Sequence, residues 1–120
     1  MSEEHRVDLV PVDNRVVVEF NGEVLADTTE AVRVDETNYS PVYYLPRHAV
    51  RMDAMRPSDH RTHCPYKGDA NYFSIEVNGK LAENAVWYYE EPIGAVHGLK
   101  GLVAFYPEKI DSISVDGKTL

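Results

Sequence analysis

The sequence predicts a mainly β fold, a single compact antiparallel β domain that contains hairpins and one short helix. The dipeptide Asn-Gly occurs twice, at residues 21–22 and 78–79, and each copy follows a run in which apolar and polar residues alternate. Five other short segments are rich in β-branched and aromatic residues, which are common in strands. These observations together indicate the all-β class.

Each Asn-Gly pair predicts a two-residue hairpin turn. A type I′ turn needs a positive φ angle at both central residues, and Asn followed by Gly adopts these angles most easily. The first hairpin is predicted to join strands over residues 15–20 and 23–27, and the second to join strands over residues 71–77 and 80–82. Two hairpins of one type favour an antiparallel sheet.

The five further strands differ in their expected burial. They are predicted over residues 31–35, 42–45, 86–89, 102–106 and 110–115. Residues 102–106 are apolar on both faces, which indicates a central strand. Residues 110–115 alternate instead, so we expect one of their faces to be solvated.

The chain between Pro46 and Pro57 is predicted to form one or two helical turns. Proline suits the first turn of a helix, and Val50, Ala54 and Met55 follow at helical spacing. Residues 57–67 are predicted to form the longest irregular loop of the domain. Long ordered loops often carry functional residues, so this loop is a candidate site.

Length and composition limit the organisation of the chain. Its 120 residues suit one domain, which we place at residues 14–117 after an N-terminal extension of residues 1–13. Cys64 is the only cysteine, so no intrachain disulfide forms. The N-terminus lacks the apolar core of a signal peptide, and no apolar run approaches the roughly 20 residues that span a bilayer. We therefore expect a cytoplasmic protein without a membrane partner.

The charge of the chain argues against nucleic acid as a partner. The net charge is −8, from 20 acidic and 12 basic residues, and no stretch gathers five or more Lys and Arg. A general nucleic-acid binder relies on a basic surface to neutralise phosphates. An acidic protein still accommodates a cationic pocket for a small molecule, and the composition leaves open whether the chain forms a homo-oligomer.

Several short motifs resemble one known family. They are Tyr44-Leu45-Pro46-Arg47, Thr62-His63-Cys64-Pro65-Tyr66-Lys67-Gly68 with Ala70 and Tyr72, Trp87 with Pro92, and Gly101-Leu102-Val103-Ala104-Phe105-Tyr106. In this order they resemble the small bacterial domain of unknown function 427 over residues 14–117, and the Cys-Pro-Tyr-Lys-Gly string is the most specific part. The resemblance implies a compact, mostly β fold and brings no established activity. The family pattern has acidic residues after Pro46-Arg47, where this chain has His48 and Ala49.

Cys64 is the candidate catalytic residue. A thiolate is both a nucleophile and a soft ligand, and nearby positive charge stabilises it. Arg61, His63 and Lys67 lie within three residues of Cys64. The alternative is a small apolar core residue, because free cysteine is often buried and neighbours along a strand or loop need not face each other.

A second pattern predicts a pocket for a small anionic or planar aromatic molecule. Basic and aromatic side chains recur in the segments that carry the family resemblance, and the candidate ligand-binding residues are Tyr44, Arg47, Tyr66, Lys67, Tyr72 and Trp87. Lys67 is a candidate anion contact, although Lys67-Gly68 lacks the further glycines and the following helix of a phosphate loop. The alternative is an ordinary core whose tyrosine hydroxyls reach the surface.

No metal site and no cofactor is predicted. His60, His63 and Cys64 fall within five residues, but a structural zinc site usually needs about four ligands and the other histidines are scattered. No complete catalytic motif occurs, so the sequence leaves open whether the chain is an enzyme. Two hypotheses remain. One is a small-molecule binding or catalytic domain centred on residues 64–68, and the other is a noncatalytic protein-interaction module.

Overall fold

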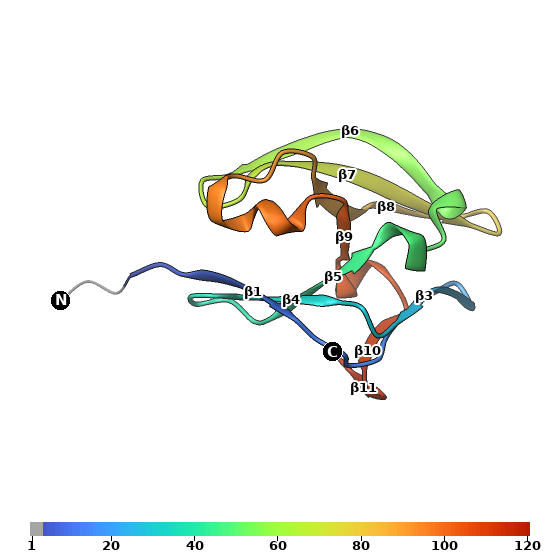
Figure 1. Cartoon of the computed structure of the whole chain (residues 1–120). Helices are drawn as coiled ribbons and strands as arrows, with labels where there is room; N and C mark the ends of the chain where they lie inside the picture. Colours follow the sequence, from blue (N-terminus) through green and yellow to red (C-terminus); the bar gives the residue numbers. More distant parts are fainter. Residues whose placement is uncertain (1–3) are drawn as a thin grey trace.

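A seven-stranded antiparallel sheet dominates the computed structural model, which describes residues 4–120 (Figure 1). Its strands follow the order β1-β4-β5-β9-β8-β7-β6, and a second sheet of four strands follows the order β11-β10-β2-β3. The strands are β1 Val7–Pro11, β2 Val16–Phe20, β3 Glu23–Thr28, β4 Val32–Glu36, β5 Val42–Pro46, β6 Met55–Cys64, β7 Gly68–Val77, β8 Lys80–Tyr89, β9 Leu102–Phe105, β10 Ser112–Val115 and β11 Lys118–Thr119. The predicted mainly β, antiparallel fold is confirmed.

Both predicted hairpin turns are confirmed. Asn21 and Gly22 have φ angles of 50° and 80° between β2 and β3, and Asn78 and Gly79 have φ angles of 49° and 82° between β7 and β8. Positive φ at both central positions defines a type I′ turn. An Asp-Gly turn at residues 116–117, where no hairpin is predicted, joins β10 to β11 in the same way.

The helical segments are short. The predicted helical turns between Pro46 and Pro57 are present as two 3₁₀ helices, η1 (Arg47–Ala49) and η2 (Met52–Ala54). Two further 3₁₀ segments follow, η3 (Gly94–Leu99) and η4 (Pro107–Lys109). Among residues 4–120, no helix has the length and apolar character that crossing a membrane requires.

The prediction of an irregular loop over residues 57–67 is wrong, because most of that segment belongs to β6. This strand is the outermost of the large sheet and pairs only with β7. Most side chains of an edge strand are exposed, so its polar sequence shows no alternation between a buried and a solvated face. Pro57 is tolerated because an edge strand does not need every backbone N–H for pairing.

Two strands extend beyond the predicted segments. β8 runs without a break from Lys80 to Tyr89 and so joins the predicted segments 80–82 and 86–89. β1 comes from Val7–Pro11, where no strand is predicted, and it pairs with β4 at the other edge of the large sheet. The large sheet therefore begins at Val7.

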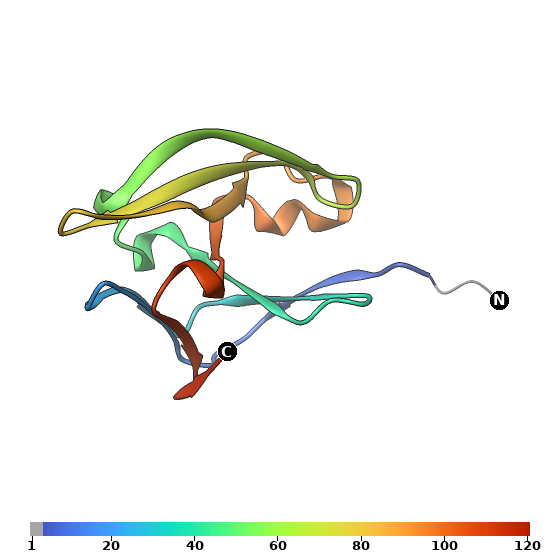
Figure 2. The same ribbon diagram turned by 180° about the vertical axis from the view of Figure 1, so that it is seen from behind.

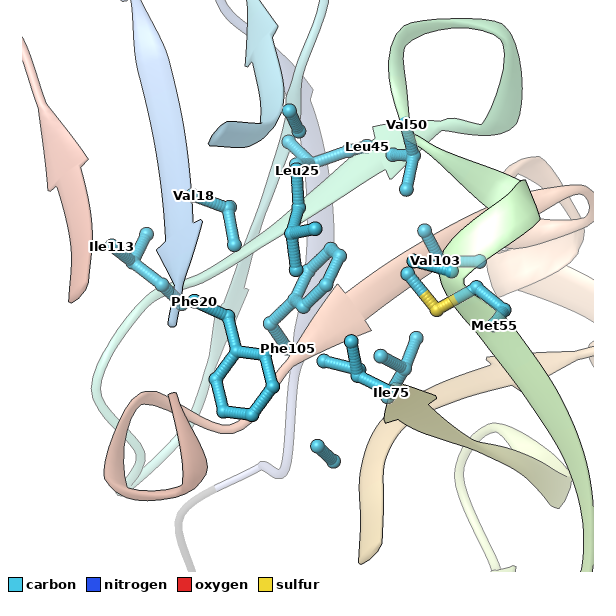
Figure 3. Packing of buried hydrophobic residues seen from close by; sticks show 14 of the residues in the cluster. Val18, Phe20, Leu25, Leu45, Val50, Met55, Ile75, Val103, Phe105 and Ile113 are labelled. Atoms are coloured by element: carbon cyan, nitrogen blue, oxygen red, sulfur yellow. The ribbon is translucent and has the colours of Figure 1, made fainter. Parts of the chain in front are cut away.

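The central strands β5 and β9 bury side chains on both faces of the large sheet. Val103 and Phe105 of β9 and Leu45 of β5 pack in a first apolar cluster, which fills the space between the two sheets (Figure 3). Ala104 and Tyr44 alternate with them and pack in a second cluster on the opposite face. This burial on both sides confirms the central position predicted for residues 102–106.

The large sheet is strongly curved. Figures 1 and 2 show β6, β7 and β8 as one layer and β1, β4 and β5 as another, with β9 crossing between them. The helix η3 lies between these layers and buries Val96 and Leu99 in the second cluster. The curvature brings side chains from distant positions in the strand order onto one concave surface.

Candidate functional site

A pocket of about 570 Å³ lies on the face of the large sheet that carries the second cluster. We call it the tyrosine pocket, and its lining residues are Val34, Glu36, Tyr39, Ser40, Val42, Tyr44, Thr62, Cys64, Lys67, Tyr72, Trp87, Tyr89 and Tyr106. Five of the seven predicted site residues are among them, namely Tyr44, Cys64, Lys67, Tyr72 and Trp87. These five come from β5, β6, the β6–β7 turn, β7 and β8, so the curved sheet is what brings them together.

Strand pairing aims the aromatic side chains into the tyrosine pocket. Tyr72 of β7 and Trp87 of β8 are directly paired across the two strands, and Tyr89 follows Trp87 by two residues. Residues two apart on a strand share a face, so all three point to the concave side. The rings of Trp87 and Tyr106 are in contact, with centroids 4.4 Å apart.

Tyr66 does not line the pocket. Its side chain is 49% exposed and stacks on the ring of His5, with centroids 3.7 Å apart and planes 15° apart. The adjacent Cys64 and Lys67 face the pocket while Tyr66 covers the N-terminal segment. Residues that are adjacent in the Cys-Pro-Tyr-Lys-Gly motif therefore do not all line the pocket.

Arg47 lies on the opposite face of the sheet from the pocket. Its guanidinium carbon is 4.6 Å from the ring centroid of Tyr88 and 5.6 Å from that of Phe73. Tyr88 and Phe73 each follow a pocket residue in their strand and so point the other way. The Nε of Arg47 is buried without a hydrogen-bond partner among residues 4–120. The cation therefore packs against aromatic faces and does not reach the tyrosine pocket.

A nearly buried ion pair stands at one end of the tyrosine pocket. Nζ of Lys67 binds Oε1 of Glu36, and the two side chains are only 9% and 12% exposed. The other carboxylate oxygen of Glu36 lies 3.0 Å from Nε2 of His5. The charge of Lys67 is therefore balanced within the site, and Glu36 joins the pocket to the N-terminal segment.

Cys64 stands beside this pair. Its Sγ lies 3.9 Å from Nζ of Lys67, and the backbone N–H of Lys67 donates to the carbonyl oxygen of Cys64 at 3.2 Å, which makes the tight turn. Gly68 completes the turn with a φ of 112°, and a Cβ there would lie 3.2 Å from the carbonyl oxygen of Glu91. Cys64 is half-buried and belongs to neither apolar cluster. Its thiol faces a cavity.

Hydroxyl groups supply neutral polar atoms to the pocket, beside the ion pair of Lys67 and Glu36. The hydroxyl oxygens of Thr62 and Tyr72 lie 2.8 Å apart, and those of Tyr72 and Tyr106 lie 3.4 Å apart. The indole N–H of Trp87 donates to the hydroxyl oxygen of Tyr44 at 3.0 Å. The pocket thus combines aromatic walls with neutral groups that both donate and accept hydrogen bonds.

Burial raises the pKa of three of the pocket tyrosines. It is the main cause that raises the pKa of Tyr44, Tyr89 and Tyr106 above the ordinary value for tyrosine, because a phenolate loses its hydration when buried. For Tyr106, the hydrogen bond with Tyr72 raises the pKa further. The three phenols, which are protonated at neutral pH as ordinary tyrosines are, therefore stay protonated to higher pH.

One protein-family model matches nearly the whole chain. The family model NTP_transf_9, described as Domain of unknown function (DUF427), matches residues 8–116. The chain belongs to the DUF427 family. This match confirms the family predicted from the motifs, and no curated protein matches the chain. The description of the family assigns no activity to it.

The DUF427 chain holds pocket residues that the sequence did not single out. Glu36 has no local signal, because nothing near it in the sequence indicates a partner 31 residues away. Tyr89 could have been predicted from strand alternation, since it follows Trp87 by two residues on the same strand and so shares its face. The curvature of the sheet, which brings Glu36 to Lys67, decides the position of Glu36, whereas strand periodicity alone would have identified Tyr89.

A larger and more open hollow of about 800 Å³ adjoins the tyrosine pocket of the DUF427 chain and shares Thr62 with it. The charged side chains of Arg61, Asp69, Glu90 and Glu91 line this hollow together with His63, whose Nδ1 lies 2.7 Å from Oδ1 of Asp69. In the described part of the chain, no three His, Cys, Asp or Glu residues are grouped so that they could hold a metal ion. His60 packs against the ring of Tyr72, with centroids 4.5 Å apart.

Proposed function

We propose that this protein binds a small planar molecule with neutral hydrogen-bonding groups in the tyrosine pocket. The observation that carries the proposal is the convergence of aromatic faces and protonated hydroxyls in one cavity of about 570 Å³. Small-molecule sites are typically concave and mostly apolar, with a few placed polar groups. Aromatic walls bind a flat ring, and the hydroxyls select its orientation.

The charges around the pocket favour a neutral ligand over an anionic one. Lys67 is already paired with Glu36, and Arg47 lies on the opposite face of the sheet. An anion that contacts Lys67 has to displace the Glu36 carboxylate or share the cation with it. Leaving a buried charge without its partner is costly, so a neutral ligand fits the site better.

Cys64 is the candidate reactive group of this site. Its sulfur lines the pocket and lies beside the ammonium of Lys67, so a bound molecule is within reach of a nucleophile. We expect a cytoplasmic location, in which a thiol stays reduced. The alternative of a noncatalytic interaction module has less support, because these polar groups converge on a cavity and not on a flat surface.

The name of the family model, NTP_transf_9, points to nucleoside triphosphates. A nucleobase is planar and carries neutral donors and acceptors, so it belongs to the proposed ligand class. Adenosine and ATP are therefore included among the probes. Tighter binding of ATP than of adenosine would mean that phosphates contribute.

The chain offers a single reporter for the test. Trp87 is the only tryptophan, and its indole N–H gives one signal in a ¹H–¹⁵N correlation spectrum. Benzamide, benzoate and cyclohexanecarboxamide separate planarity from charge. We expect benzamide to shift the indole signal in a saturable manner, benzoate to bind more weakly, and the non-planar amide to leave the signal in place.

Matched variants locate the binding. Tyr72→Leu should weaken the binding of benzamide, because Tyr72 lines the pocket. Tyr66→Leu should leave it unchanged, because Tyr66 packs on His5 outside the lining. If none of the planar probes, adenosine included, shifts the Trp87 signal, the proposed function is wrong.

A further inference from the structure

Arg47 carries a positive charge that nothing in the described part of the chain balances. Its guanidinium forms no ion pair with a carboxylate of residues 4–120. Its Nε is also the one buried side-chain nitrogen or oxygen among these residues that lacks a hydrogen-bond partner. Buried polar groups nearly always have a partner, so each exception needs an explanation, such as a functional role. We therefore treat Arg47 as a candidate binding group.

Two aromatic rings hold this guanidinium in place. The rings of Phe73 and Tyr88 stack on each other with centroids 4.6 Å apart, and the guanidinium carbon of Arg47 lies 5.6 Å and 4.6 Å from them. A cation at such distances is attracted to the face of an aromatic ring. The two terminal nitrogens of Arg47 also have no hydrogen bond to residues 4–120, but they are not buried as Nε is. They are therefore positioned and available for a ligand.

A hollow of about 390 Å³ adjoins Arg47 at the end of β8. We call it the Arg47 hollow, and its lining residues are Arg47, Tyr89, Glu90, Glu91, Lys100 and Gly101. It shares only Tyr89 with the tyrosine pocket. Its wall carries two cations and two carboxylates, and none of these four charges forms an ion pair with another. Charges of both signs are therefore available to one ligand.

We propose that the Arg47 hollow binds a free α-amino acid by its main-chain groups, with the carboxylate on Arg47 and the ammonium against Glu90 and Glu91. A guanidinium binds a carboxylate through two parallel N–H···O hydrogen bonds, which gives direction as well as attraction. The ammonium of the same molecule supplies three donors, which the two carboxylates accept. This inference is independent of the proposed function, because it concerns a different cavity on the opposite face of the large sheet.

The mixture of charges favours a zwitterion over simpler ligands. Phosphate is attracted to Arg47 and Lys100 but repelled by Glu90 and Glu91, and a simple cation meets the reverse situation. A zwitterion has an opposite charge to meet at each of its ends, so it gains from both pairs. The two charges of an α-amino acid stand on one carbon, which suits a small hollow, whereas the two termini of a peptide are far apart.

The side chain of the amino acid has room beyond the Arg47 hollow. Glu90 and Glu91 also line the larger hollow of about 800 Å³, so the two hollows meet at these residues. We therefore expect recognition of the main-chain groups with little selection for side-chain size. A small amino acid is consequently a sufficient probe.

L-Alanine tests the proposal together with two derivatives that each lack one charge. N-Acetyl-L-alanine keeps the carboxylate without the ammonium, and L-alaninamide keeps the ammonium without the carboxylate. The reporters are the Nε–H of Arg47 and the backbone amide of Gly101 in ¹H–¹⁵N correlation spectra of the full-length protein. We expect L-alanine to shift both signals in a saturable manner, and each derivative to bind at least about tenfold more weakly.

Matched variants assign the binding to these side chains, with Gly101 as the reporter. Arg47→Lys keeps the charge but loses the planar fork, so it should weaken the binding of L-alanine by about tenfold. Arg51→Lys is the control and should change nothing, because Arg51 pairs with two acids outside the hollow. Glu91→Gln should weaken the binding of L-alanine but strengthen that of N-acetyl-L-alanine, because it removes a charge that attracts ammonium and repels carboxylate.

The Trp87 indole signal reports on the tyrosine pocket and so separates the two sites. It should stay in place while L-alanine shifts the reporters of the Arg47 hollow, and it shows that each variant is folded. If L-alanine shifts neither reporter, or if Arg47→Lys and Arg51→Lys bind it equally well, the inference is wrong and the proposed function is unaffected. If inorganic phosphate or N-acetyl-L-alanine binds as tightly as L-alanine, the hollow is an anion site and the amino-acid class is refuted.

Discussion

Lys67 and Glu36 form an ion pair across 31 residues of sequence and from nearly opposite ends of the strand order. Glu36 ends β4, next to one edge of the large sheet, whereas Lys67 stands in the turn between the two strands at the other edge. The pair therefore closes the curve of the sheet at the tyrosine pocket. Because both side chains are nearly buried, its energetics differ from those of the exposed pairs elsewhere.

The first prediction concerns this pair. Glu36→Gln should destabilise the protein by about 3–5 kcal/mol, because it leaves the ammonium of Lys67 buried without a counter-charge. Urea unfolding at neutral pH measures the change. The double variant Glu36→Leu with Lys67→Met should be much less destabilised, since no charge is left unpaired. A double variant as unstable as Glu36→Gln alone would show that packing, and not the unpaired charge, causes the loss.

The second prediction compares two glycines with positive φ. Gly79→Ala meets no atom within 4 Å, so it should cost only the backbone strain of the turn, about 1 kcal/mol. Gly68→Ala should cost more, about 3 kcal/mol, because its φ is 112° and its Cβ would press on the carbonyl oxygen of Glu91. Urea unfolding of both variants gives the comparison. Equal losses would mean that the contact with Glu91 is readily relieved.

The third prediction concerns pH. Burial raises the pKa of Tyr44, Tyr89 and Tyr106 in the folded state. As the pH rises above about 10, the unfolded chain releases phenol protons that the folded chain retains, so the unfolded state binds fewer protons and stability falls. Phenolate absorbance should show fewer than eight titrating tyrosines until the protein unfolds, and all eight in concentrated urea. Simultaneous titration of all eight in the folded protein would contradict the burial.

The fourth prediction concerns the hydrogen bond between Trp87 and Tyr44. Tyr44→Phe removes the acceptor of the indole N–H and should destabilise the protein by about 1–2 kcal/mol. The single indole signal should move to higher field, because the proton is no longer hydrogen-bonded. Tyr106→Phe keeps the acceptor and serves as the control. Equal shifts in the two variants would show that ring packing, and not the hydrogen bond, sets the position of the signal.

The sequence predicted the hairpin turns and the central strand, because each of them depends on a few residues that are consecutive in the chain. The Asn-Gly pairs at residues 21–22 and 78–79 predicted both turns, because only a few residue types adopt positive φ at two successive positions. The apolar run over residues 102–106 predicted a central strand, because burial on both faces requires apolar residues at every position. β6 was missed, because an edge strand is held by backbone pairing with β7 and needs no apolar pattern.

By itself, the sequence determined the β class, the hairpins and the family, since these depend on local backbone preferences and on motifs that are read directly. Only the tertiary structure decided which motif residues meet. It placed Tyr44, Cys64, Lys67, Tyr72 and Trp87 around one cavity, turned Tyr66 to His5 and put Arg47 on the other face. The reason is geometric. Alternation along a strand assigns a side chain to one of two faces, but the curvature of the sheet and the register of distant strands decide which faces converge.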